Sequence, residues 1–132
     1  MASIFTRIIN GEIPSYKIAE DEDYLAFLDI NPLAKGHTLV VPKKEADYLF
    51  ELDEQTYQGL WLFARKVAVA LDRTMTCKRI GVAVIGLEVP HAHIHLVPID
   101  GVYDIDFSKE KLQLSADEFE MIAQKVSEAV KG

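Results

Sequence analysis

The sequence predicts an α+β fold: a five-stranded antiparallel sheet with a long helix and a C-terminal helix packed on one face. The first observation behind this prediction is a set of short, strand-like segments, most of them joined by short links that favour antiparallel pairing. The second is a pair of longer segments, after Asp53 and after Ser115, with apolar residues at helical spacing. The third is a run of alternating histidines that indicates a further strand. A sheet that carries its helices on one face belongs to the α+β class.

The first half of the chain is expected to form a short helix and three strands. Apolar residues recur at helical spacing over residues 4–9, and the Asn-Gly pair that follows is typical of a helix end. Residues 16–20 and 24–28 read as two strands joined by an acidic turn. A third strand is expected over residues 38–41, and Pro42 should stop it.

The second half is expected to form a long helix, two more strands and a last helix. Asp53 can cap a helix that runs to about Met75, and residues 80–85 and 91–97 predict the fourth and fifth strands. Residues 101–114 have no regular pattern. The long helix has an apolar stripe made of Tyr57, Leu60, Trp61, Ala64, Val67, Ala68, Leu71 and Met75. The last helix begins with a capping box, Ser115-Ala116-Asp117-Glu118, and its apolar face consists of Phe119, Ile122, Ala123, Val126 and Val130.

Composition narrows the functional classes. A chain of 132 residues without a linker or repeat is expected to form a single domain over residues 1–132. The formal charge of −7 argues against nonspecific binding to nucleic acid or to anionic lipid. Cys77 is the only cysteine, so we expect a reducing, cytoplasmic location. The N-terminus does not resemble a signal peptide, and the longest apolar runs are too short to span a bilayer.

Three histidines alternate with apolar residues at His91, His93 and His95. On a strand, all three imidazoles would share one face while Ala92 and Ile94 line the other. Imidazole is the side chain that titrates near neutral pH, so such a cluster can supply a nucleophile, a proton donor and a hydrogen-bond donor to an oxyanion. The fourth histidine, His37, begins the third predicted strand, and spacing alone does not bring it to the cluster.

Two other interpretations of the cluster remain open from the residues alone. One is a solvated strand face on which histidine is incidental. The other is a catalytic zinc site, which three imidazoles and a water would suit. However, residues i and i+4 on a strand lie roughly 13 Å apart at Cα, so His91 and His95 would not easily share an ion. The sequence also has no HExxH, CxxC, phosphate-binding loop, dinucleotide-binding GxGxxG or serine nucleophile elbow.

Residues 91–97 match the motif of the histidine triad (HIT) family, in which three histidines alternate with apolar residues. Residues 4–14 resemble the opening segment of the Hint-type members, and residues 25–32 and 36–43 resemble two further family segments. The resemblance covers most of the first 98 residues in the family's order. It implies a HIT-like fold, no cofactor, a homodimer in which the long helix with Trp61 is a plausible contact, and a nucleotide substrate.

The resemblance also implies catalytic roles for the four histidines. His93 matches the nucleophile that attacks the α-phosphorus and forms a nucleotidyl-histidine intermediate. His91 and His95 match the flanking triad positions, and we expect His95 to contact the phosphate oxygens. His37 matches the histidine that the family places beside the triad.

The nucleotide-binding residues implied by the resemblance lie in the first half of the chain. Asp29 matches the acid that binds the ribose hydroxyls, although an Asp before Pro32 can also simply form a turn. The apolar wall around the base matches Phe5, Ile8, Phe27 and Ile30, which could equally be core residues.

The sequence departs from the family pattern just before the triad. Leu87-Glu88 stands where members often carry Gln-Ser or Gln-Thr, so Glu88 is expected in the nucleotide site, where a carboxylate would repel phosphate unless it is protonated, turned away or used as a proton carrier. The asparagine that helps to hold phosphate has no clear match in residues 79–84. Some members build a structural zinc site on an early CxxC, but Thr6 and Arg7 occupy that region, so no zinc is expected.

The resulting hypothesis is a hydrolase that acts at the α-phosphorus of purine nucleoside phosphoramidates or related nucleotidyl conjugates. The alternatives are a nucleotide-binding or scaffold protein with weak catalysis, and a dinucleoside polyphosphate hydrolase. The sequence does not select the base, the leaving group or the physiological substrate.

Overall fold

The computed structural model describes residues 2–132 of the chain. Its elements follow the predicted order. They are α1 (Ile4–Ile9), β1 (Lys17–Glu20), β2 (Tyr24–Leu28), β3 (Thr38–Pro42), a 3₁₀ turn η1 (Leu49–Glu51), α2 (Glu54–Thr74), β4 (Arg79–Ala83), β5 (Ile94–Ile99), a second 3₁₀ turn η2 (Val102–Asp104) and α3 (Ala116–Lys131).

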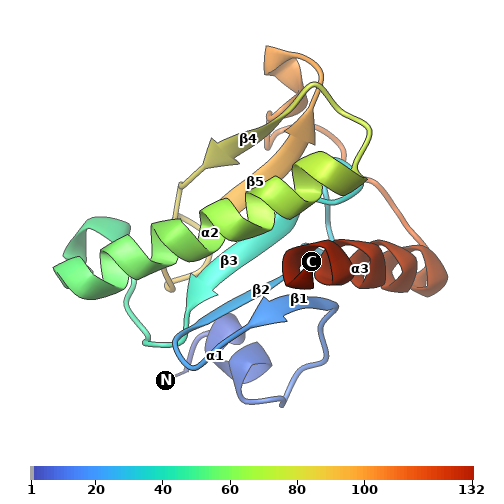
Figure 1. Ribbon diagram of the computed structural model, residues 1–132. Helices are drawn as coiled ribbons and strands as arrows, with labels where there is room; N and C mark the ends of the chain where they lie inside the picture. The colour runs from blue at the N-terminus through green and yellow to red at the C-terminus, as the bar shows by residue number, and fades with distance from the viewer. Residues whose placement is uncertain (1) are drawn as a thin grey trace.

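The five strands form one antiparallel sheet in the order β1-β2-β3-β5-β4. Figure 1 shows α2 lying across β3 and β5 and α3 lying across β1 and β2, so that both long helices cover the same face. The apolar stripes of α2 and α3 pack there against Ala26, Val40, Ile94 and other sheet residues. The predicted α+β fold class and the antiparallel sheet are confirmed.

Side-chain caps set the starts of the two long helices. The Asp53 carboxylate accepts a hydrogen bond from the Thr56 backbone N–H at 3.1 Å, and α2 begins at the next residue after Asp53. Ser115 and Glu118 form the predicted capping box at the start of α3. Both caps were predicted from the sequence, and both are confirmed.

A second apolar cluster lies on the opposite face of the sheet. The short helix α1 packs there and contributes Phe5 and Ile8. Alternate residues of β2 and β3 complete the cluster, namely Leu25, Phe27, Leu39 and Val41. Because apolar residues cover both faces of β2 and β3, every residue of these two strands is buried. This second face carries the histidines.

The last two strands differ from their predicted bounds. The fifth strand begins at Ile94 rather than at His91, and the fourth ends at Ala83 rather than Ile85. The ladder between β3 and β5 stops at the pair Val40–Ile94, because Pro42 has no N–H to extend it. The alternation of side chains continues upstream, and Ala92 and Ile94 still pack into the helix-side core.

The segment expected to be irregular, residues 101–114, contains η2 and otherwise has no regular structure. The backbone N–H of Leu112 donates to the Pro32 carbonyl at 2.9 Å, which ties the end of this segment to the loop after β2. Within residues 2–132, no helix combines the length and the apolar character needed to cross a bilayer.

Candidate active site

A cavity of about 430 Å³ lies between α1, the loop after β2, residues 85–89 and the irregular segment. Its size is in the range of small-molecule sites. Nine of the ten site residues expected from the sequence line it: Phe5, Ile8, Phe27, Asp29, Ile30, His37, Glu88, His93 and His95. The tenth, His91, does not.

His91 lies behind the cavity wall and is completely buried. Its Nε2 is 2.8 Å from the Pro42 carbonyl oxygen, and its Nδ1 is 2.8 Å from Ser3 Oγ. A carbonyl can only accept, so Nε2 carries the proton and Nδ1 accepts from the serine hydroxyl. Both nitrogens are therefore occupied inside the protein, and the structure gives His91 a supporting position.

A polar network anchors His91 from the start of α1, and sequence reasoning missed it. Ser3 caps α1 by accepting from the Thr6 N–H at 3.0 Å. The Glu45 carboxylate accepts from the Ser3 backbone N–H at 2.6 Å and from the Thr6 hydroxyl at 2.9 Å. Forty-two residues separate Ser3 from Glu45, so no local pattern announces their contact.

His93 presents an unprotonated nitrogen to the cavity. Its Nδ1 lies 2.7 Å from the backbone oxygen of His91 and must donate to it, because that oxygen can only accept. In the neutral ring the lone pair is then on Nε2. Burial lowers the pKa of His93, partly offset by the hydrogen bond to the His91 carbonyl. The edge-to-face contact with Phe5, at 5.0 Å between ring centroids, helps to hold the ring.

His37 and His95 have the opposite arrangement. The backbone N–H of Leu33 donates to His37 Nδ1 at 3.0 Å, so the neutral His37 ring carries its proton on Nε2. That proton points to His95 Nδ1, 3.0 Å away. His95 therefore accepts at Nδ1 and carries its own proton on Nε2. The hydrogen bonds that run from Leu33 through His37 to His95 thus leave His95 Nε2–H as a donor. This donor lies beside His93, because the ring centroids of His93 and His95 are 4.9 Å apart.

Both rings of this pair are neutral at pH 7. Burial and, to a smaller extent, the nearby Lys111 charge together lower the pKa of His37 to about 4. Burial lowers the pKa of His95 to about 3, with smaller contributions from His93 and His37. The histidines of the cavity therefore supply hydrogen bonds and a lone pair, but no positive charge.

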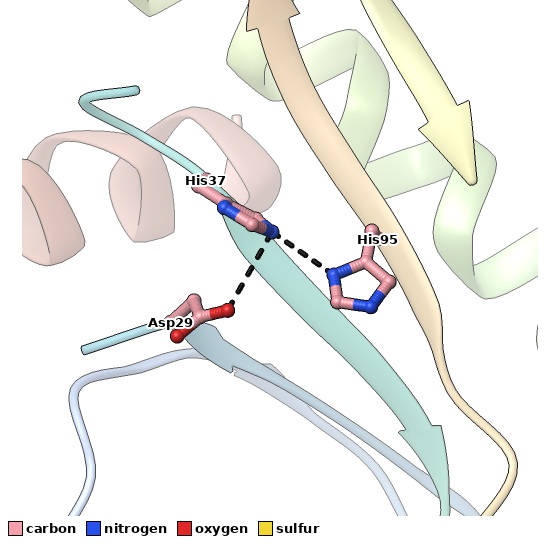
Figure 2. A group of neighbouring side chains, drawn as sticks. All are labelled: Asp29, His37 and His95. Carbon is pink, nitrogen blue, oxygen red and sulfur yellow. Dashed lines mark hydrogen bonds and ion pairs between the residues drawn. The ribbon is translucent and has the colours of Figure 1, made fainter. Parts of the chain in front are cut away.

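Asp29, His37 and His95 come close enough to suggest a metal site, since one ligand atom from each lies within 4.8 Å of the others. Figure 2 shows His37 between the other two, with Nε2 facing both the carboxylate and His95 Nδ1. However, the bond from Leu33 leaves the proton of His37 on that same Nε2, and a protonated nitrogen has no lone pair for a metal. The donor set therefore fits a hydrogen-bond relay and does not fit an ion.

Asp29 is placed where a turn and a ligand can both use it. One carboxylate oxygen accepts from the Asn31 N–H at 2.8 Å, which is the turn-forming contact expected of an Asp in this loop. The other lies 3.6 Å from His37 Nε2. Burial raises the pKa of Asp29, and the Asn31 hydrogen bond and Lys111 oppose the increase.

The apolar residues of the site serve as core and as cavity wall at once. Phe5, Ile8 and Phe27 belong to the second apolar cluster and also line the cavity. Ile30 differs, because 63% of it is exposed at the rim. Glu88 is exposed and lines the cavity, and its charge raises the pKa values of His93 and Asp29.

Two cavity residues in the irregular segment were missed by the sequence analysis. The Phe107 ring meets His95 edge to face, with 4.7 Å between centroids, and lies 6.1 Å from His37. Lys111 lines the same side of the cavity. A phenylalanine and a lysine in a segment without periodicity carry no positional signal.

The model of the HIT domain family matches residues 10–102 of the chain. The chain belongs to the HIT family.

Full-length relatives agree with this membership. The chain is 36% identical over 132 residues to an uncharacterised HIT-like protein of Borreliella burgdorferi, covering 94% of this chain and 95% of that protein. It is 30% identical over 133 residues to the adenosine 5′-monophosphoramidase of Schizosaccharomyces pombe, covering 99% and 100%. The crystal structure of a Hit-like protein from Bartonella henselae superposes with a TM-score of 0.85 at 31% identity, covering 96% and 95%. The resemblance seen in the sequence is confirmed, and so is the HIT fold.

Proposed function

We propose that this HIT protein is a nucleotide hydrolase that acts at the α-phosphorus of purine nucleoside phosphoramidates or related conjugates. The observation that carries the proposal is the pairing of a bare Nε2 on His93 with an Nε2–H on His95 at one cavity wall. Family membership and the relatives named adenosine 5′-monophosphoramidase support the same class of reaction.

The reaction has two steps. His93 Nε2 attacks phosphorus, the N–P bond forms, and the bond to the leaving group breaks as that group takes up a proton, so a nucleotidyl-histidine results. Water then attacks the same phosphorus and gives up a proton, and the N–P bond breaks to release the nucleoside monophosphate and regenerate neutral His93. The N–H of His95 donates to the phosphate oxygens, where negative charge grows in each transition state.

The rest of the cavity suits a nucleoside. The Asp29 oxygen that faces His37 is free of the turn contact and can accept from ribose hydroxyls. Phe5, Ile8 and Phe27 offer an apolar surface for a purine ring, and Ile30 closes the rim.

The decisive test is capture of the intermediate. Wild-type protein mixed with an adenosine phosphoramidate and denatured at alkaline pH should show the mass of a nucleotidyl adduct on His93, and His93→Ala should show neither adduct nor turnover. Turnover at the wild-type rate by His93→Ala contradicts the proposal. A panel that adds guanosine phosphoramidates, aminoacyl adenylates and dinucleoside polyphosphates would identify the leaving group.

A nucleotide-binding protein with weak catalysis is the second candidate, and Glu88 favours it. A carboxylate at the cavity wall repels the phosphate that His93 must attack. On this alternative, AMP binds while no substrate of the panel turns over, and Glu88→Ser raises turnover. If Glu88→Ser instead lowers turnover, the carboxylate assists the reaction.

We also propose a homodimer. β4 is the terminal strand of the sheet, with β5 as its one neighbour, so its outer edge is available for pairing. Leu62 and Val69 of α2 and Val82 of β4 are exposed apolar residues. Trp61 instead packs against the core, so it is a less suitable contact. Sedimentation at micromolar concentration should give twice the chain mass, and a monomer mass contradicts this proposal.

A further inference from the structure

The irregular segment between η2 and α3 covers the histidine pair of the cavity. Phe107 lies against His95 and His37, and Leu112 is tied to Pro32 by a backbone hydrogen bond of 2.9 Å. Lys111 lies between these two attachments and lines the cavity. Its side chain is therefore held near the histidines from both directions along the chain.

Lys111 is the one cationic side chain among the cavity-lining residues of the described part of the chain. The cavity also contains the carboxyl groups of Asp29 and Glu88, while His37 and His95 are neutral at pH 7. The whole chain has a formal charge of −7. A phosphate in this cavity would therefore find hydrogen-bond donors and two carboxyl groups, with Lys111 as the only compensating charge.

The ammonium group of Lys111 has a donor to spare. Its Nζ donates to the carbonyl oxygens of Phe107 at 2.6 Å and Lys109 at 2.8 Å. An ammonium has three N–H bonds, so one remains for a ligand. The two carbonyls fix the position of the charge, which reduces the entropy lost when it binds an anion. The charge also reaches the pocket residues, since it lowers the pKa values of both Asp29 and His37.

We propose that Lys111 binds the phosphate group of the nucleotide and determines selectivity for nucleotides over uncharged nucleosides. This inference rests on the proposed function, because it places a nucleotide in the cavity. The ligand class is a nucleoside 5′-phosphate, and further phosphate groups strengthen the interaction. Residues 85–88 of the cavity wall carry no hydroxyl or amide side chain that could bind the phosphate in place of Lys111.

The test compares AMP with adenosine by calorimetry in wild-type protein, Lys111→Met and Lys109→Met. Lys109 is the matched control, because it is an exposed lysine of the same segment and lies outside the cavity wall. Lys111→Met should raise the Kd for AMP about tenfold, the typical effect of losing a charge-assisted hydrogen bond, and leave the Kd for adenosine unchanged. Lys109→Met should leave both dissociation constants unchanged.

A second variant covers a structural failure of the first. Lys111→Gln keeps an N–H donor for the backbone carbonyls but removes the charge, and it should also weaken AMP binding selectively. If the Lys111 variants bind AMP and adenosine equally more weakly, Lys111 only positions the segment. If Lys111→Met and Lys109→Met raise the Kd for AMP equally, Lys111 acts only through long-range electrostatics and does not contact the phosphate. Either result overturns this inference and leaves the proposed function standing. Failure of the wild-type protein to bind AMP overturns both.

Discussion

His93 and His95 are buried to nearly the same degree, at 6% and 8% exposed, yet they present opposite groups to the cavity. His93 is held by a backbone carbonyl, so its Nδ1 is protonated and its Nε2 is bare. His95 is held through His37 by a backbone amide, so its Nδ1 accepts and its Nε2 is protonated. Residue type and burial therefore do not assign the chemical roles of these two histidines. The polarity of the backbone group at the far end of each hydrogen-bond chain assigns them.

Substitution of His93 should reduce turnover more than any other change. His93→Gln replaces the bare nitrogen with an amide that cannot attack phosphorus, and turnover should fall by roughly 10⁴-fold or more. His95→Gln keeps an N–H donor, and it should lose roughly 10²-fold at most. Steady-state rates of the two variants check this. Equal losses of turnover in the two variants would show that His93 and His95 do not have the different roles that their hydrogen bonds predict.

Next in size is the removal of the relay. His37→Leu leaves the Leu33 N–H unpaired and frees His95 to move its proton to Nδ1. We expect a loss of about 1–3 kcal/mol in the free energy of unfolding and roughly tenfold in kcat. Nitrogen NMR of labelled His95 should change from the Nε2–H to a mixed tautomer. If the tautomer stays unchanged in His37→Leu, the relay does not control His95.

The stability of the protein should depend on pH through the buried pair His37 and His95. The pKa values of His37 and His95 fall on folding, to about 4 and about 3, so the unfolded chain binds more protons below pH 6.5 and stability falls as the pH falls. Between pH 7 and pH 5 each of these two histidines should lower the free energy of unfolding by about 2 kcal/mol, so the total decrease should be about 4 kcal/mol. The raised pKa of Asp29 acts in the opposite sense at lower pH.

Urea denaturation at the two pH values measures this decrease, and the range above pH 5 avoids carboxylates with lowered pKa values, such as Glu20. His95→Gln removes one titrating group and should flatten the dependence. A wild-type protein equally stable at pH 7 and pH 5 contradicts the prediction.

Loss of the Ser3 hydroxyl that supports His91 should reduce turnover less than the changes above. Ser3→Ala removes the cap of α1 and the hydroxyl that donates to His91 Nδ1, whereas Ser115→Ala removes only the cap of α3. Each lost cap costs about 1 kcal/mol of stability. Ser3→Ala should in addition lower kcat severalfold, because the His91 backbone oxygen holds His93. Matching kcat values for the two variants would separate the Ser3 network from catalysis.

The sequence was sufficient for the elements whose signals are periodic or local. The apolar stripes of α2 and α3, the caps at Asp53 and Ser115 and the order of the strands all follow from spacing within one segment. The alternation around the triad also predicted which face the histidines occupy. The alternation placed the start of β5 at His91 rather than at Ile94, because the pairing between β3 and β5 stops before Pro42, which lies far away in the chain.

The site was only partly predictable, because its chemistry depends on contacts between distant segments. His37 and His95 are 58 residues apart, and only the folded sheet makes them a pair. His91 lies behind the cavity wall because it is hydrogen-bonded to Ser3 and Pro42, which are distant from it in the sequence. The cavity histidines are covered by Phe107, which lies in a segment without a regular pattern. Family resemblance located the histidines, but it did not separate the supporting residue from the two that face the cavity.

The three groups that determine the histidine tautomers are the carbonyls of Pro42 and His91 and the amide of Leu33. Most substitutions leave such groups in place. A mutational scan would therefore report Leu33 as an ordinary apolar residue while its most consequential atom went untested. Replacing the Leu33 amide with an ester by chemical synthesis removes that one N–H and keeps every side chain. It would alter His95 through two hydrogen bonds, from Leu33 to His37 and from His37 to His95.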